Sequence, residues 1–485
     1  GGFQEVEQMN LFKDMVCYQE EVRDPSRMAE VLNRVIEKAV RGSAPAQINV
    51  PRDYWTQVID IDLPPIVRFE RQGGGKEAID KAAKILSEAK FPVILSGAGV
   101  VIGDAIEDCK KLAEKLDAPV CSGYQHNDSF PGSHPLAVGP LGYNGSKAAM
   151  QLISKADVVL ALGTRLNPFS TLPGYGIDYW PKKASIIQVD MNPDRIGLTK
   201  KVTVGICGDA KMVSQQLLTK LSKNAGDNGR EERKNSIHQT KSAWLQTLSG
   251  LDHEDDDPGT VWNKEARERD KDRMSPRQAW RAIQAAMPDD VIISSDIGNN
   301  CAIGNAYPTF EKGRKYLAPG LFGPCGYGFP SILGAKIGCP DTPVIGFAGD
   351  GAFGISMNEM SSCAREEWPA ITMVIFRNYQ WGAEKRNSIL WFDDNFVGTE
   401  LDPELSYAKV ANACGLKGVT VKTMEETTKA IKQSCEDQKK GITTFIEVIL
   451  NQELGEPFRR DAMKKPVEVA GINKKDMKPQ KSAIN

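Results

Sequence analysis

The chain has 485 residues, of which 41% are hydrophobic, and its 61 lysines and arginines nearly balance its 63 aspartates and glutamates. This length suits about three domains of roughly 150 residues each, and the near-neutral charge provides no basic surface for nucleic acid or an anionic membrane. No apolar run reaches the roughly 18 residues that a membrane span needs, so we expect small-molecule substrates and neither a nucleic acid nor a membrane as partner. The ten cysteines form no C-x-x-C pair, which favours reduced, mostly buried thiols in a cytoplasmic protein.

Residues 1–60 contain the pattern of one helix and one strand. Apolar residues recur at helical spacing between Met28 and Ile36, and a strand pattern runs from Ala46 to Val50 and ends at a proline. One helix and one strand cannot bury a core by themselves. We therefore expect residues 1–60 to be the end of a larger α/β domain whose start is missing.

Helix and strand patterns alternate between residues 77 and 223, after a linker at 61–76 that is rich in proline and glycine. Helices are predicted at about 77–89 and 104–116, and strands at 93–96 and near residues 119, 158 and 186. This alternation is typical of a parallel sheet with helices on its faces. Residues 224–273 are polar and charged, and we interpret them as a charged linker.

A third α/β unit is predicted at residues 274–450, followed by a lysine-rich tail at 451–485. Ser275 and Pro276 are typical of a helix N-terminus, as the cap and the first helical residue. Strands are predicted at 291–294, 343–347, 370–376 and 443–448, and a helix at about 355–367. The predicted fold class is therefore α/β, with three doubly wound parallel-sheet domains, of which the first is incomplete.

The stretch GFAGDGAFG, residues 346–354, lies where the third unit passes from a strand to a helix. Its glycines fit the dinucleotide pattern G-x-G-x-x-G, but the carboxylate of Asp350 would repel a bare pyrophosphate. Asn378 lies just past the next strand, and right-handed crossovers place both residues at one edge of the sheet. Their oxygens suit Mg²⁺, which would join the carboxylate to a phosphate. Close backbone approach to that phosphate is expected at Gly349, Gly351 and Ala352.

Two other interpretations of this loop stay open. A nicotinamide site would need an acidic residue after the second strand, where the chain has Phe376-Arg377-Asn378. The loop is also compatible with a tight glycine turn in which the aspartate only caps a helix.

A glycine-flanked aspartate, followed some 25 to 30 residues later by an apolar strand that ends in asparagine, resembles the cofactor motif of thiamine diphosphate enzymes. The resemblance implies that Asp350, Asn378 and the backbone carbonyl of Gln380 bind Mg²⁺. The family usually has two asparagines where this chain has Arg377-Asn378. Arg377 is thus a departure at the first position of the pair, which is not a metal ligand.

The same resemblance implies contacts to the rest of the cofactor. Polar residues after the strand at 291–294 would touch the diphosphate, and a loop at 320–330 would place a bulky residue under the V-shaped cofactor. That place falls on a cysteine, which is smaller than the usual methionine, isoleucine or leucine. The glutamate that activates the cofactor in such enzymes would precede Gly1. The implied contacts are Gln4, Asn299, Asn300, Gly323 and Cys325.

Longer segments resemble the sulfoacetaldehyde acetyltransferases within this family. They are residues 139–147, 165–170, 380–387 and 453–461. The implied reaction converts sulfoacetaldehyde and phosphate to acetyl phosphate and sulfite, with thiamine diphosphate and Mg²⁺ as cofactors. Covalent catalysis would come from the cofactor, so the protein need only bind, orient and stabilise charge.

Both substrates of this reaction are anions, so cationic side chains are expected in the cleft. A histidine in a loop that faces the cofactor in related enzymes and a tryptophan after the metal strand are further candidates. Each also has a second interpretation, as a surface charge, a loop histidine or a packing tryptophan. The candidate catalytic residues are His126, Trp381, Lys385, Arg386, Arg459 and Arg460.

Other assignments stay open. An acetolactate synthase-like carboligase and an oxalyl-CoA-type decarboxylase use the same cofactor, and a non-catalytic fragment could retain the fold. Gly97-Ala98-Gly99 resembles a nucleotide loop only weakly, and we interpret it as a structural turn. Because the active site of this family lies between subunits, the resemblance implies a homodimer or homotetramer.

Overall fold

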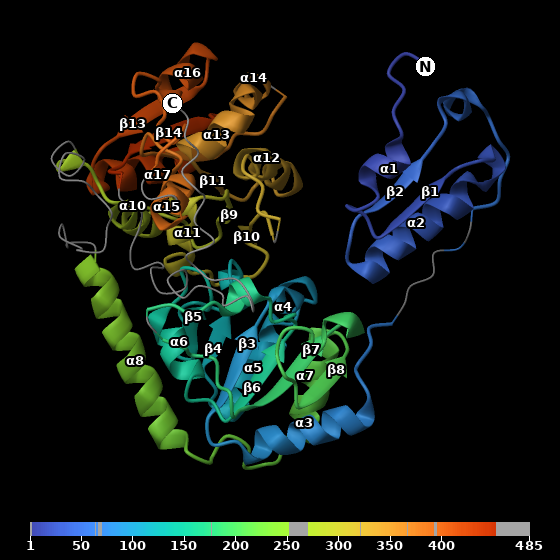
Figure 1. The fold of residues 1–485 in the computed structure, drawn as a ribbon, viewed down its shortest axis with the longest axis vertical. Coiled ribbons are helices and arrows are strands. Elements are labelled where there is room, and N and C mark those ends of the chain that lie inside the picture. Colours follow the sequence, from blue (N-terminus) through green and yellow to red (C-terminus); the bar gives the residue numbers. More distant parts are fainter. Residues whose placement is uncertain are drawn as a thin grey trace, which may run out of the picture. The chain divides into compact units, whose positions relative to one another are not determined.

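Figure 1 shows the fold of the chain as a computed structural model. The structure describes residues 2–63, 65, 70–175, 177–251, 270–320, 322–365, 367–391 and 395–452, and at 250, 251, 386, 387 and 389–391 it describes the backbone alone. The chain divides into two units, residues 1–71 and 72–485. Within the described ranges, no helix is both long and apolar enough to cross a membrane.

The smaller unit is built around a β-α-β arrangement. Strands β1 (Tyr18–Glu21) and β2 (Ala46–Asn49) pair in parallel, and helix α2 (Met28–Gly42) connects them, burying Val31 and Val35. The predicted helix and strand are confirmed. Strand β1 escapes prediction because its sequence, Tyr-Gln-Glu-Glu, has no apolar alternation. The unit also contains α1 (Gln8–Phe12), η1 (Pro25–Arg27) and η2 (Arg52–Thr56).

The larger unit begins with a central six-stranded sheet in which every pairing is parallel, in the order β5-β4-β3-β6-β7-β8. Its strands are β3 (Pro92–Ser96), β4 (Val120–Ser122), β5 (Ala137–Pro140), β6 (Val158–Leu162), β7 (Ser185–Asp190) and β8 (Val204–Cys207). Its helices are α3 (Lys76–Glu88), α4 (Ala98–Ile102), α5 (Ile106–Leu116), α6 (Lys147–Ile153) and α7 (Ala210–Lys220). This order is that of a doubly wound sheet: strands β4 and β5 are added on one side of β3, and strands β6 to β8 are added on its other side.

A second parallel sheet follows in the order β10-β9-β11-β12-β14-β13. Its strands are β9 (Ile292–Ser295), β10 (Tyr316–Leu317), β11 (Val344–Gly349), β12 (Thr372–Arg377), β13 (Lys417–Val421) and β14 (Thr444–Ile449). Its helices are α10 (Pro276–Gln284), α11 (Asn299–Ile303), α12 (Gly328–Gly338), α13 (Asp350–Ser356), α14 (Met360–Cys363), α15 (Gly382–Trp391), α16 (Tyr407–Ala413) and α17 (Met424–Gln438). Short 3-10 turns are η3 (Asn127–Ser129), η4 (Pro168–Thr171), η5 (Pro193–Arg195), η6 (Gly304–Ala306) and η7 (Met357–Glu359). The predicted parallel α/β fold class is confirmed.

Two hydrophobic cores lie on opposite faces of this second sheet. Strand residues alternate between them: Ile345 and Phe347 of β11 pack with α10 and α17, whereas Val344 and Ala348 pack with α12, α13 and α16. Both faces are therefore covered by helices (Figure 1). Because both faces are covered, the carboxyl edge of the strands is the part of the sheet that is open to a ligand.

The helix predicted at about 355–367 begins earlier than expected. Helix α13 starts at Asp350, directly after β11, with Gly349 as its N-cap, and a 3-10 turn separates it from α14. Ile355, at the start of the predicted helix, is 57% exposed, while Phe353 of the observed helix is fully buried. The prediction was wrong because the turn from strand to helix needs no intervening loop. The GDG sequence is thus itself the first turn of the helix.

The segment predicted as a charged linker at 224–273 contains the long helix α8 (Arg230–Leu251). Trp244 and Leu248 are buried against Ala148 of α6. The fully buried side chain of Arg233 donates five hydrogen bonds, of 2.6 to 3.0 Å, to main-chain carbonyls. This helix was not predicted because its sequence is mostly charged. A few buried residues are enough to pack such a helix against the domain while its other faces stay solvated.

Candidate functional site

Three polar residues come directly after the ends of three neighbouring strands. Asp296 follows β9, Asp350 follows β11 and Asn378 follows β12, and β11 pairs with both β9 and β12. The strands before Asp350 and Asn378 are therefore neighbours, with Gly349 in register with Phe376. All three side chains are at most 2% exposed. The three side chains thus lie at the same edge of the sheet, where little water competes for their oxygens.

The carboxylate of Asp350 is held by main-chain and side-chain donors. Its Oδ2 atom accepts hydrogen bonds from the Tyr379 amide at 2.7 Å and from Arg377 Nη1 at 3.1 Å, and its Oδ1 atom accepts from the Gly351 amide at 2.9 Å. Burial raises the pKa of Asp350 to about 6, although Arg377 and these hydrogen bonds oppose the shift. The group therefore sits in an environment that lacks the solvation of a full negative charge.

Several buried side-chain oxygens near these strand ends lack a hydrogen-bond donor within the described residues. They belong to Asn300, Asn378 and Gln380, whose side chains are 4%, 2% and 3% exposed. The Gln380 side chain does donate from Nε2 to the Gln452 carbonyl at 3.0 Å. A buried amide oxygen without a donor is costly. A bound cation or a protonated ligand group would satisfy it, so the residues present fit a divalent metal.

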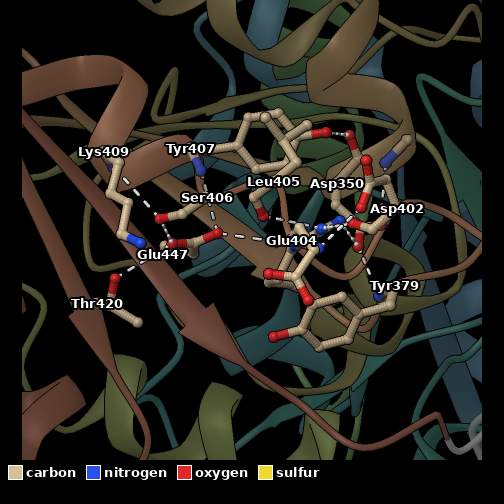
Figure 2. A network of polar contacts seen from close by, with 12 residues as sticks. Asp350, Tyr379, Asp402, Glu404, Leu405, Ser406, Tyr407, Lys409, Thr420 and Glu447 are labelled. Carbon is tan, nitrogen blue, oxygen red and sulfur yellow. Dashed lines mark hydrogen bonds and ion pairs between the residues drawn. The ribbon is translucent and has the colours of Figure 1, made fainter. Parts of the chain in front are cut away.

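Arg377 is the centre of a buried polar network, part of which Figure 2 shows. Its guanidinium is 1% exposed, bonds the Asp350 carboxylate and lies 3.8 Å from Oε1 of Glu447, which is 2% exposed. Nη2 donates to the carbonyls of Asp402 and, at 3.0 Å, Leu405. Glu447 in turn accepts hydrogen bonds from Ser406 Oγ at 2.7 Å and the Tyr407 amide at 3.1 Å. The departure from the Asn-Asn pattern is thus part of a connected network of buried charges.

Asp296 joins the end of β9 to the loop that contains Cys325. Its Oδ1 accepts from the Gly326 amide at 3.1 Å and its Oδ2 from the Gly328 amide at 2.7 Å. A Cβ atom on Gly326 would lie 2.9 Å from Cγ2 of Ile355 in α13, so the loop lies against that helix. Burial raises the pKa of the half-buried Cys325 thiol, as do the nearby Asp296 and Glu384 carboxylates. Cys325 is therefore a thiol rather than a thiolate at neutral pH.

Gly351 and Trp381 are in direct contact. A Cβ atom on Gly351 would lie 2.8 Å from Cδ2 and Cε2 of the Trp381 ring. The indole therefore covers the first turn of α13, and a glycine is needed beneath it. This position supports a packing role for Trp381 at the site, next to the expected phosphate contacts Gly349 and Ala352.

The predicted cations differ in what the structure describes of them. Lys385 is not a free charge. Its Nζ atom lies 2.5 Å from Oε1 of Glu400 and 5.3 Å from the centroid of the Phe396 ring, over the face of that ring. Arg386 lies on α15, but its side chain is outside the described atoms, and Arg459 and Arg460 lie outside the described residues altogether.

His126 lies in a loop that is tied to the C-terminal sheet through Asn305. The Gln125 amide donates to Asn305 Oδ1 at 3.1 Å, and Asn127 Nδ2 donates to the Asn305 carbonyl at 2.9 Å. Asn305 lies in η6, which directly follows α11, the helix that begins with the predicted diphosphate contacts Asn299 and Asn300. Burial, aided by the positive charge of Arg165, lowers the pKa of His126 to about 4. The imidazole is therefore neutral at physiological pH.

The remaining predicted positions are three glycines and Gln4. Gly97 is the N-cap of α4, and Gly99 lies in the first turn of that helix. Gly323 adopts a φ of +63° beside Ile297, and Gln4, in the smaller unit, is exposed with a φ of +61°. Gly97 and Gly99 make a close backbone crossing, because a Cβ atom on Gly99 would lie 2.7 Å from Cα of Gly163. The structural interpretation of Gly97-Ala98-Gly99 accounts for these contacts.

Glu447 and Asn305 belong to the site but escape sequence reasoning. Glu447 is the single carboxylate in the apolar strand Thr-Phe-Ile-Glu-Val-Ile, and a lone charge in a buried strand is a usable signal of a buried ion pair. Asn305 follows no motif, and its importance comes from contacts with residues about 180 positions earlier in the chain.

Comparison with known proteins places this geometry in a family. Residues 79–217 match the thiamine pyrophosphate enzyme central domain, and residues 296–448 match the thiamine pyrophosphate enzyme C-terminal TPP binding domain. The chain is 78% identical over 481 residues to a probable sulfoacetaldehyde acetyltransferase of Rhizobium meliloti, with 99% of this chain and 81% of the relative covered. A sulfoacetaldehyde acetyltransferase of Roseovarius nubinhibens is 74% identical over 480 residues, with 99% and 80% covered. A probable acetolactate synthase large subunit of Methanococcus aeolicus is 28% identical over 445 residues, with 89% and 72% covered. The chain therefore belongs to the thiamine pyrophosphate enzymes, in the family of the sulfoacetaldehyde acetyltransferases.

Proposed function

We propose that this protein converts sulfoacetaldehyde and phosphate to acetyl phosphate and sulfite, with thiamine diphosphate and Mg²⁺ as cofactors. One observation carries the substrate assignment, namely 78% and 74% identity to sulfoacetaldehyde acetyltransferases along 99% of the chain. The acetolactate synthase relative, at 28% identity, gives weaker support to a carboligase.

The proposed metal ligands are the Asp350 carboxylate, the Asn378 side-chain oxygen and the backbone carbonyl of Gln380. Burial of the carboxylate and the unsatisfied amide oxygen of Asn378 support this set. Mg²⁺ takes few protein ligands and completes its octahedron with water and phosphate oxygens. The metal would therefore bind together with the diphosphate, and would compensate the carboxylate charge that burial disfavours.

The proposed diphosphate contacts are the polar start of α11, at Asn299 and Asn300, and the first turn of α13, at Ala352. Unbonded amides at the start of a helix favour an anion. The loop with Gly323 and Cys325, fastened by Asp296, would support the cofactor rings. When bound, thiamine diphosphate supplies the nucleophilic chemistry. The role of these residues is to hold it in one orientation.

The side chains proposed near the substrates divide into neutral and charged groups. His126, with its pKa lowered to about 4, would act as a neutral hydrogen-bonding group rather than as a cation. Trp381 would form an apolar wall, and Lys385 would act through its pair with Glu400. Arg386, Arg459 and Arg460 are proposed to bind the sulfonate and phosphate anions, and a homodimer or homotetramer is proposed as the active form.

A product assay tests the proposal. The protein is supplied with thiamine diphosphate, Mg²⁺ and sulfoacetaldehyde, with and without phosphate, and sulfite and acetyl phosphate are measured. We expect both products, with acetyl phosphate strictly dependent on phosphate. Acetolactate formed from pyruvate, or carbon dioxide released from oxalyl-CoA, without any sulfite would replace the proposal by one of its alternatives.

A further inference from the structure

Arg377 occupies a position where thiamine diphosphate enzymes usually have asparagine, and its side chain is held from several directions. Its guanidinium bonds Asp350, donates to two main-chain carbonyls and stacks on the ring of Tyr379 at 4.2 Å. The Glu447 carboxylate lies 3.8 Å from its Nε atom. At 1% exposure, the side chain is shielded from water.

The two oxygens of the Asp350 carboxylate are unequally occupied. Oδ2 accepts two hydrogen bonds, from Arg377 Nη1 at 3.1 Å and from the Tyr379 amide at 2.7 Å. Within the described residues, Oδ1 accepts one hydrogen bond, from the Gly351 amide at 2.9 Å. A carboxylate oxygen has two lone-pair sites. Oδ2 is therefore filled, while Oδ1 keeps one site open.

We propose that Arg377 is a positioning residue for the metal: it fixes Oδ2 of Asp350 so that Oδ1 is the single oxygen presented to the cation, together with Oδ1 of Asn378. This inference rests on the proposed function, because it concerns the same metal and cofactor. Tyr407 reinforces the arrangement by donating from its hydroxyl to the Asp350 carbonyl at 2.9 Å, as Figure 2 shows. The carboxylate thus meets the metal without first having to rotate.

Charge and geometry make opposite predictions for the removal of Arg377. A guanidinium close to a cation site repels the cation, so removal of its charge alone would tighten metal binding. Removal of a positioning contact would weaken it, and outer contacts of this kind typically change metal affinity 10- to 100-fold. The sign of the change therefore separates the two effects.

The test compares Glu447→Gln with the double variant Arg377→Asn/Glu447→Gln. Glu447→Gln is the reference because Arg377→Asn alone would leave the Glu447 carboxylate buried without a counter-charge. The dissociation constant of Mn²⁺ is measured by isothermal titration calorimetry in the presence of saturating thiamine diphosphate, and the melting temperature is recorded without metal. We expect the dissociation constant to rise about 10- to 100-fold from the single to the double variant. An unchanged or lower dissociation constant would overturn the inference.

Two further variants separate positioning from folding. Arg377→Lys keeps the charge but not the planar fork, so it should also weaken Mn²⁺ binding at least about tenfold. Thr420→Val removes a 3.1 Å bond to the far side of Glu447, and it should leave the dissociation constant within about twofold. Equal weakening in Thr420→Val would assign the effect to general loss of structure and overturn the inference.

Failure of the proposed function has a different result. If the unsubstituted protein binds no thiamine diphosphate in a metal-dependent manner, or if Asp350→Ala binds it equally well, the proposed cofactor site is refuted together with the role of Arg377. If the unsubstituted protein binds and Asp350→Ala does not, the site stands. The Arg377 variants then decide the inference alone.

Discussion

Gly351→Ala tests whether the indole of Trp381 defines the shape of the GDG turn. The added Cβ atom would lie 2.8 Å from Cδ2 and Cε2 of Trp381 and 2.9 Å from its Cε3. Carbon atoms rest about 3.5 Å apart, so the ring must move by roughly 0.7 Å. Overpacking of this kind costs about 1–3 kcal/mol, against a gain of about 0.5–1 kcal/mol for alanine over glycine in a helix. The difference lies between about 0 and 2.5 kcal/mol, with a central loss of about 1 kcal/mol, which corresponds to a fall of roughly 2–4 °C in the melting temperature.

A double-mutant cycle gives this prediction its sharpest form. In a Trp381→Ala background the clash is absent, so Gly351→Ala should become stabilising by about 0.5–1 kcal/mol. Thermal unfolding of the four proteins, followed by circular dichroism, measures both steps. Affinity for thiamine diphosphate should fall in Gly351→Ala, because the displaced ring adjoins the proposed phosphate contacts. Equal destabilisation in both backgrounds would refute the packing argument, since the cost would then lie elsewhere than in the contact with Trp381.

Three further predictions follow from buried charges. Arg233→Met removes five hydrogen bonds to main-chain carbonyls and should lower the free energy of unfolding by at least about 3 kcal/mol. The control Arg230→Met removes partly exposed ion pairs and should change the free energy of unfolding by less than about 1 kcal/mol. Similar urea midpoints for the two variants would contradict this prediction. Because the pKa of Asp350 is raised to about 6, the metal-free folded protein keeps a proton that the unfolded chain has released, so its stability relative to Asp350→Asn should rise as the pH falls through 6. A pH-independent difference between these two proteins would exclude the raised pKa. The pKa of His126 is lowered to about 4, so its stabilising contribution is present above about pH 6.5 and lost as the pH falls toward 4; a nuclear magnetic resonance titration of His126 with a midpoint near 6.5 would show that it is solvated instead.

Much of the fold could be predicted because its signals are local. Strands β9, β11, β12 and β14 are buried apolar runs bounded by turn residues, and each lies within about two residues of its predicted position. Helix α10 was predicted from Ser275 and Pro276. In the structure Ser275 forms a capping box with Gln278, and Pro276 is the first helical residue. Elements without such signals were harder to predict. Strands β1 and β10 are short or polar, and they are ordered by the neighbours that pair with them.

The early start of α13 shows why boundaries next to functional turns are difficult to predict. Glycine and aspartate are typical of loops, so the sequence favours a loop between β11 and the helix. In the structure the same residues form the first helical turn, because the carboxylate of Asp350 accepts hydrogen bonds from Gly351 and from the neighbouring strand end at Tyr379. The donor at Tyr379 lies beyond the next strand, so no local sequence pattern predicts this hydrogen bond.

The sequence by itself determined the class of chemistry. The spacing of Asp350 and Asn378 across one crossover, with glycines around the aspartate, is enough to place two oxygen ligands at one edge of a parallel sheet. Only the tertiary structure decided how that carboxylate is held, since Arg377 and Tyr379 donate hydrogen bonds to it from the end of the next strand, and Glu447 of β14 lies beside Arg377. The physical reason is that backbone periodicity is local, whereas burial of a charge is tolerated only where distant partners converge on it.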